Sequence, residues 1–233
     1  KLSKRHGATG FYDLIDEGYL PEAIINYIAL LGWCPKDNQE IFTLKELEKA
    51  FDISGISKSP AVFDYDKLSW FNGEYIKAMT PEKFTEVAMP YYKKVFGDKQ
   101  MPYEKFAAIL QKRTTQLTQI PEMLDFFAEL PSYTKELFVN KKSKTNLENS
   151  PVVLKEAYDR LKAMPEWNET SIHDCLINMA VEKELKNGTV MWPVRIAAAG
   201  KTVTPGGAVE ILDILGRDES LARLEKGMAI LAE

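Results

Sequence analysis

Cysteine and histidine are scarce in this 233-residue sequence, which contains two of each. Cys34 and Cys175 are far apart and show neither CxxC spacing nor neighbouring histidine pairs, so neither a disulfide framework nor a zinc site is expected. His6 and His173 lack a Ser or Cys neighbourhood that would indicate a nucleophile with its base. We therefore expect no metal site and no catalytic histidine, and this cysteine usage suits a reducing cytoplasm.

Long apolar runs are also missing. The longest apolar segment, Ala23 to Trp33, is broken by Asn26 and Gly32, whereas a bilayer span needs ~20 continuous apolar residues. The chain begins with Lys1, and no apolar stretch typical of a signal peptide follows it. These features predict a cytoplasmic protein without a membrane anchor, and we interpret the chain as an internal fragment of a longer protein.

An excess of positive charge is absent as well, since the formal net charge is -4. Indiscriminate nucleic-acid binding is therefore disfavoured, because Lys and Arg supply most non-specific affinity for phosphates. Any RNA contact has to be local. One local basic cluster has interleaved aromatic residues that suggest phosphate contacts and a stacked base, although a solvated loop is the simpler reading: Tyr133, Lys135, Phe138, Lys141, Lys142 and Lys144.

Apolar residues recur at helical spacing along most of the chain, and runs of alternating β-branched residues are nearly absent. Thr43 and Glu46 have the spacing of a capping box. Gly188, Gly200 and Gly216 stand where helix C-caps are expected. Together these signals predict a mainly α protein with helices near 21–32, 80–96, 102–116, 121–130, 150–164 and 171–187.

Connections rich in Pro, Gly, Ser and Asn indicate where this helical chain divides. The most polar of them lies within 140–150, and another boundary is expected near 78–81. No internal repeat or low-complexity tract is present, so a solenoid is not supported. We predict three segments, covering residues 1–79, 80–145 and 146–233.

The stretch from Lys1 to Gly7 clusters cations on a glycine-flanked loop, where they can neutralise a leaving phosphate. By composition alone it also reads as a solvated basic terminus. It resembles the Lys-Met-Ser-Lys-Ser signature loop of class I aminoacyl-tRNA synthetases, in the form seen in glutamyl-tRNA synthetases. Further blocks match that family in the same order, at 26–33, 63–72, 191–197, 204–207 and 210–216.

The chain is therefore similar to the C-terminal part of a bacterial-type glutamyl-tRNA synthetase. That resemblance implies a helical connecting domain carrying the signature loop, followed by an all-α anticodon-binding cage of two subdomains. Within the loop it assigns ATP binding to Lys1, Ser3 and Lys4, with Lys4 in the catalytic role of steadying the triphosphate. In the mid-chain helices, it implies that Asn72 is a cap or polar bridge rather than a catalyst.

The same resemblance implies partners and anticodon contacts. ATP with Mg and L-glutamate would be substrates of the full enzyme, with no cofactor tightly bound in this fragment. The RNA partner would be the tRNA for glutamate, with the tRNA for glutamine left open, and a monomer is expected. Single-stranded bases are read by stacking and edge hydrogen bonds, roles that the resemblance gives to Arg113, Arg195, Thr204 and Pro205, although either arginine also reads as a surface cation.

The sequence departs from the family pattern in places, and it allows rival interpretations. Ala198 to Gly200 replaces a common Leu-Thr-Gly, and Gly207 to Val209 lacks the usual bulky residue after the turn. The family's His-Ile-Gly-His signature does not occur in the sequence, so we expect the nucleotide fold to precede Lys1 and the fragment alone to be inactive. The alternatives are a class I lysyl-tRNA synthetase fragment and a helical protein-interaction module; glutaminyl synthetases are disfavoured by their β-barrel anticodon region.

Overall fold

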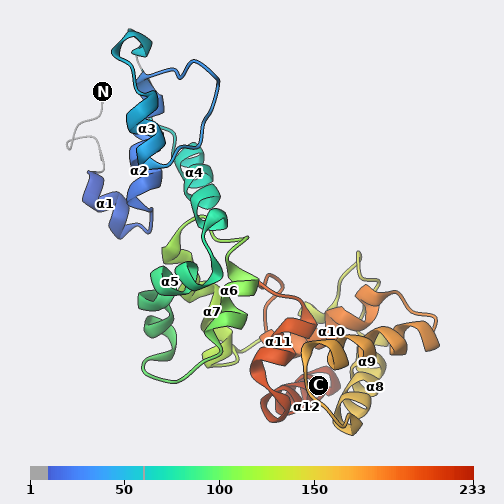
Figure 1. The fold of residues 1–233 in the computed structure, drawn as a ribbon. Coiled ribbons are helices and arrows are strands. Elements are labelled where there is room, and N and C mark those ends of the chain that lie inside the picture. The colour runs from blue at the N-terminus through green and yellow to red at the C-terminus, as the bar shows by residue number, and fades with distance from the viewer. Residues whose placement is uncertain (1–9, 60) are drawn as a thin grey trace. The chain divides into compact units, whose positions relative to one another are not determined.

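The computed structural model describes residues 10–59 and 61–233, which fold into helices joined by connections of varied length (Figure 1). Across these described residues there is no β-strand, and the isolated β-bridges pair Trp33 with Ile56 and Asn140 with Thr145. The predicted mainly α fold is confirmed. Within the same residues, no helix has both the length and the apolar character to cross a membrane.

The chain divides into two compact units, one formed by residues 1–97 and 110–121 and the other by 98–109 and 122–233. The three segments expected from the sequence have different limits and stay a prediction. The first unit contains helices α1 (Phe11–Asp16), α2 (Pro21–Gly32), α3 (Leu44–Ala50), α4 (Tyr65–Ala78) and α5 (Pro81–Phe96), with short 3-10 turns η2 (Ile53–Gly55) and η3 (Leu117–Gln119).

Local signals start α2, α3 and α5 where the sequence predicts them. Pro21 occupies the first turn of α2, where its missing N–H costs nothing. The Thr43 hydroxyl accepts from the Glu46 amide at 3.2 Å, and the Glu46 carboxylate accepts from the Thr43 amide at 2.7 Å, which confirms the capping box. In α5 the Thr80 hydroxyl caps the helix, which ends at Phe96 as expected.

Asn72 is a buried polar bridge, as the resemblance implied. Its side chain is 0% exposed. Its Oδ1 accepts from the Leu20 amide at 2.8 Å, and its Nδ2 donates to the carbonyls of Gly18 at 3.2 Å and Thr115 at 2.7 Å. One amide thus joins α4 to the chain before α2 and to the segment after α6, around an apolar core of Leu14, Tyr19, Ile24, Tyr27, Leu68 and Phe71.

Helix α6 (Tyr103–Leu110) is shorter than the predicted 102–116. The amides of Arg113 and Thr114 both donate to the Leu110 carbonyl, and the Thr114 hydroxyl donates to it at 2.9 Å. Beyond this turn the Thr115 carbonyl binds Asn72 and the Leu117 amide binds the Gly18 carbonyl at 3.0 Å. Tertiary hydrogen bonds therefore replace the helical ones after Leu110.

The second unit contains most of α6 and α7 (Ile120–Ala128), then η4 (Lys135–Phe138), α8 (Asn149–Ala163), α9 (Glu169–Glu182), α10 (Asn187–Ala199), α11 (Ala208–Leu215) and α12 (Arg217–Ala232). Helix α9 ends before the predicted residue 187, and Gly188 lies inside α10, so its assignment as a C-cap is wrong. Gly200 and Gly216 are the C-caps of α10 and α11, as predicted.

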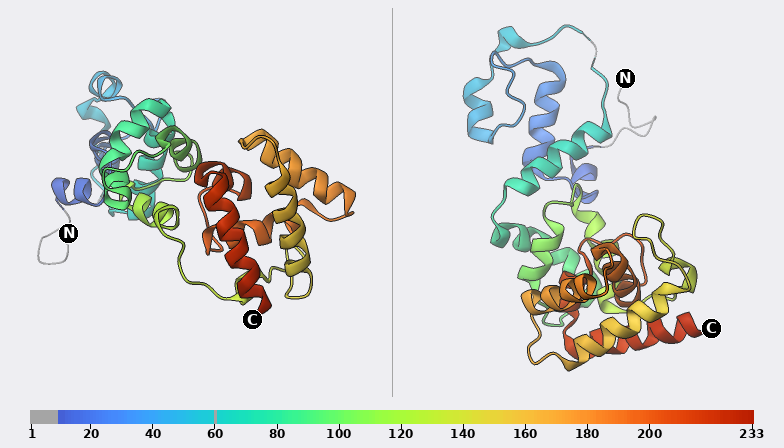
Figure 2. Two further views of the ribbon diagram at one scale, coloured as in Figure 1. Left: turned by 90° about the horizontal axis from the view of Figure 1, so that it is seen from below. Right: turned by 90° about the vertical axis from the view of Figure 1, so that its right-hand side faces the viewer.

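Helix α10 is the centre of the second unit and packs against α8, α9, α11 and α12. Helices α8 and α12 run side by side in both views of Figure 2. Ala197, Ala198 and Ala199 are each 0% exposed, and a Cβ on Gly227 of α12 would stand 2.6 Å from the Ala197 Cβ. Small residues at Ala197 and Gly227 thus let α10 and α12 approach closely.

Candidate nucleic-acid interface

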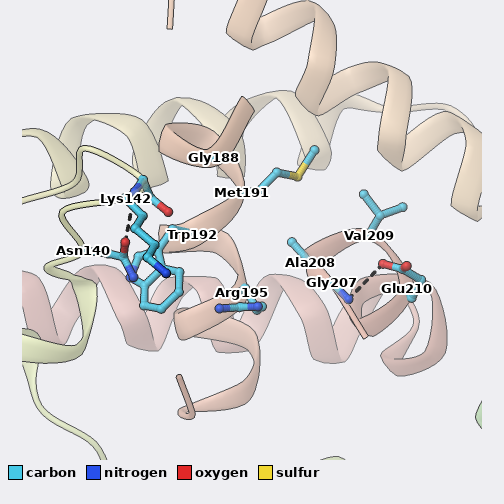
Figure 3. A pocket seen from close by; sticks show the side chains of 11 residues that line it. Asn140, Lys142, Gly188, Met191, Trp192, Arg195, Gly207, Ala208, Val209 and Glu210 are labelled. Atoms are coloured by element: carbon cyan, nitrogen blue, oxygen red, sulfur yellow. Dashed lines mark hydrogen bonds between the residues drawn. The ribbon is translucent and has the colours of Figure 1, made fainter. Parts of the chain in front are cut away.

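One side of α10 borders a cavity of about 420 Å³ in the second unit. Helix residues three or four apart share a face. The cavity is accordingly lined along α10 by Gly188, Met191, Trp192 and Arg195. In the view of Figure 3, Asn140, Lys142 and Trp192 lie at one side, Gly207 to Glu210 at the other, and Arg195 between them. The site is therefore assembled from three separate stretches of sequence.

Arg195 is held in place at the cavity. Its guanidinium carbon lies 4.6 Å from the centre of the Trp192 ring, and Nη2 donates to the Thr202 carbonyl at 3.1 Å. Trp192 is fixed in turn because its indole N–H donates to the Leu137 carbonyl at 2.9 Å. A guanidinium over an indole at the border of a cavity places a planar cation where the face or edge of a nucleobase can meet it.

The end of α10 that carries Arg195 needs glycine. Gly200 has φ +64°, and a Cβ there would come within 2.9 Å of both Pro131 Cγ and Tyr133 Cδ1. The Tyr133 hydroxyl donates to the Ala197 carbonyl at 3.4 Å. Burial raises the pKa of Tyr133 to about 12, and the nearby Arg223 guanidinium partly opposes this rise. The neutral phenol is thus part of the packing behind the cavity.

Thr204 and Pro205 are buried in the turn between α10 and α11. The Thr204 side chain is 8% exposed and its hydroxyl donates to the Gly206 carbonyl at 2.7 Å. The Gly207 amide donates to the Glu210 carboxylate at 3.1 Å and begins α11. The turn therefore presents residues 207–210 to the cavity, while the anticodon contacts expected of Thr204 and Pro205 themselves stay a prediction.

Arg113 belongs to the first unit and lies exposed in the turn after α6. The expectation that it sits on a helix is wrong, because its amide already donates to the Leu110 carbonyl in a turn at 2.8 Å. Its role as a base reader stays a prediction. Lys1, Ser3 and Lys4 lie outside the described residues, so the ATP-loop assignment also stays a prediction.

The basic cluster is partly reinterpreted. Lys141, Lys142 and Lys144 are exposed in the turn that follows η4. Phe138, however, is 0% exposed, so it is a core residue and the interpretation of it as a stacking platform is wrong. The aromatic residue at the cavity that the sequence analysis did not single out is Trp192. It lies three residues before Arg195, a spacing that puts two side chains on one face of a helix.

Comparison with known proteins agrees with this geometry. Residues 83–228 match the family described as "Anticodon binding domain", and residues 1–70 match "tRNA synthetases class I (E and Q), catalytic domain". A glutamate–tRNA ligase of Clostridium kluyveri is 51% identical over 98% of this chain and 47% of its own length. A Clostridium tetani relative with the same name is 49% identical over 98% of this chain and 46% of its length.

Solved structures give the same result. A glutamate tRNA ligase from Elizabethkingia meningosepticum, in complex with its amino acid, superposes with a TM-score of 0.79 at 29% identity, covering 96% of this chain and 43% of that one. The chain spans about half the length of the relatives it matches. Because the family match extends over residues 83–228, the chain belongs to the anticodon binding domain family, in the form carried by bacterial glutamate–tRNA ligases.

Proposed function

We propose that this chain binds the anticodon of the tRNA for glutamate. The observation that carries the proposal is the Arg195 and Trp192 pair, held at a cavity inside the region that matches the anticodon-binding family. Unpaired anticodon bases expose faces and edges that such a pair recognises. The relatives named above are glutamate–tRNA ligases, which favours this reading over the lysyl and protein-interaction alternatives.

The proposal extends to the longer protein. A whole glutamate–tRNA ligase would join L-glutamate to tRNA in the cytoplasm through a glutamyl-adenylate made from ATP, with Mg as the ATP counterion. Residues 1–70 match part of the class I catalytic family, which supports Lys1, Ser3 and Lys4 as ATP-loop residues and Lys4 as the residue that steadies the triphosphate. Monomeric behaviour and use of the tRNA for glutamine belong to the same set of proposals.

The experiment is a binding measurement with unmodified tRNA transcripts for glutamate, glutamine and lysine. The wild-type chain is titrated against each transcript at two salt concentrations, and each anticodon base of the glutamate transcript is then replaced in turn. We expect a preference for the glutamate transcript that disappears when its anticodon changes. Binding that ignores the anticodon, or no binding to any transcript, contradicts the proposal.

Arg195→Ala and Arg113→Ala rank the two candidate arginines. Loss of a base contact by Arg195 should weaken binding by ~1–3 kcal/mol and relax preference at one anticodon position. Arg195→Lys keeps the charge but not the planar fork. It should therefore retain part of the affinity but not the preference at that anticodon position. An equal loss for every anticodon would mean that the arginine touches the RNA backbone.

A further inference from the structure

The turn that follows η4 is a closed and well-defined element. Asn140 and Thr145 exchange two backbone hydrogen bonds of 3.0 Å each, and the Ser143 amide donates to the Asn140 Oδ1 at 3.0 Å. Lys144 has φ +54°, a left-handed conformation that tightens the turn. This segment, residues 140–145, is called the lysine turn below.

The lysine turn is fastened to α10. The Thr189 hydroxyl donates to the Ser143 carbonyl at 2.7 Å, and Thr189 is 3% exposed, so the bond is shielded from water. One turn further along α10, the Trp192 indole donates to the Leu137 carbonyl just before the lysine turn. The lysine turn is thus positioned by the same helix that positions Arg195.

Among the three lysines of the lysine turn, Lys142 lines the cavity and the other two do not. Lys142 lines the cavity beside Asn140 and Ser143, whereas Lys141 and Lys144 are exposed but absent from its lining. Among the described residues Lys142 forms no ion pair, in contrast to Lys201, which binds Asp125 at 2.5 Å. The carboxylate of the cavity belongs to Glu210, which lies across it and is engaged by the Gly207 amide.

We propose that Lys142 binds the backbone phosphate next to the nucleotide whose base enters the cavity beside Arg195. This rests on the proposed function and deepens it. An exposed ammonium group is a compact point charge suited to a phosphate and carries no base information. In this arrangement the planar guanidinium of Arg195 contacts the base, and the ammonium group of Lys142 binds the phosphate.

Salt-dependent binding to the glutamate transcript tests the assignment, with Lys142→Gln compared against Lys141→Gln and Lys144→Gln as matched controls. Each phosphate contact to a single strand adds about 0.7 to the slope of log K against log salt. We expect Lys142→Gln to make that negative slope shallower by about 0.7 and to weaken binding about fivefold at about 0.1 M salt. Anticodon preference should stay unchanged, and Lys142→Arg should restore both affinity and slope.

The outcomes separate the two proposals. If the wild-type chain binds with anticodon preference but Lys142→Gln behaves like Lys141→Gln, the phosphate contact is wrong and the proposed function stands. If Lys142→Gln abolishes the preference among anticodons, Lys142 reads a base and the phosphate assignment is overturned. If the wild-type chain binds no transcript, both proposals fall.

Discussion

Single polar side chains organise the interior of the first unit by satisfying backbone groups of its connecting segments. In the first unit Asn26 is 0% exposed, and its Oδ1 accepts from the Phe42 amide at 2.8 Å while its Nδ2 donates to the Glu40 carbonyl at 2.9 Å. Buried polar groups cost free energy unless they are paired. Asn26 and Asn72 therefore fix the connections around α2 and α4 at specific positions.

Tyr133 gives a prediction at the residue scale. Its folded pKa is raised to about 12 by burial, whereas an exposed tyrosine has a pKa of about 10. Burial favours the neutral phenol of Tyr133 in the folded state. Its contribution to the free energy of unfolding is therefore complete below about pH 10 and is lost as the pH rises toward about 12. Tyr133→Phe should therefore lose less stability than the wild type between these two pH values.

Urea denaturation at both ends of this pH range measures the difference. The phenol groups of the other tyrosines are present in both proteins, so the comparison isolates Tyr133. Absorbance titration at alkaline pH is a second readout, in which the variant should lack one late-ionising phenol. Identical alkaline losses of unfolding free energy in the two proteins would count against this role for burial.

At the scale of the element, capping decides where helices begin. Helix α3 is seven residues long, and short helices are marginal by themselves. Its start depends on the reciprocal bonds between Thr43 and Glu46. Hydrogen bonding to the Thr43 backbone and hydroxyl lowers the pKa of Glu46, so this stabilisation is present at neutral pH and falls as acid protonates the carboxylate.

Thr43→Ala should lower the free energy of unfolding by ~1 kcal/mol, because the Glu46 amide loses its acceptor. Thr43→Ser keeps a hydroxyl in the same place and should stay close to the wild type. Chemical denaturation followed by circular dichroism measures both variants. Equal losses for alanine and serine would show that the methyl group of Thr43, rather than its cap, contributes the stability.

At the scale of the whole molecule, the second unit depends on one buried arginine. The Arg223 side chain is 4% exposed; its Nη1 donates to the carbonyls of Phe126 at 2.7 Å and Ala198 at 2.9 Å, and its Nε pairs with Glu219 at 2.6 Å. Arg223 thus joins α7, the end of α10 and α12. The geometry behind Arg195 depends on this junction.

Arg223→Met keeps much of the aliphatic stem but leaves two buried carbonyls without a donor, so we expect a loss of about 2–5 kcal/mol. Arg160→Met is the control, because Arg160 is more exposed and pairs with the partly exposed Glu156 and Glu182; its loss should stay below about 1 kcal/mol. Urea unfolding followed through Trp167 and Trp192 reports on the second unit. Similar losses for the two variants would contradict the special role of Arg223.

The sequence by itself determined what depends on neighbouring residues. Helical periodicity, the Thr43 cap, the Thr80 start of α5 and the glycines after α10 and α11 act within one or two turns, so local patterns predict them. The family resemblance was also readable, because its motifs are short contiguous blocks.

Tertiary structure decided the features that need contacts between distant residues. Helix α6 stops at Leu110 because Asn72 and Gly18 bind the chain beyond it, and Phe138 is core rather than a base platform because it is fully buried. The cavity joins residues 140–143, 188–195 and 207–210. Burial and hydrogen bonding between such segments are set by packing, and a sequence pattern with a range of one helical turn does not specify them.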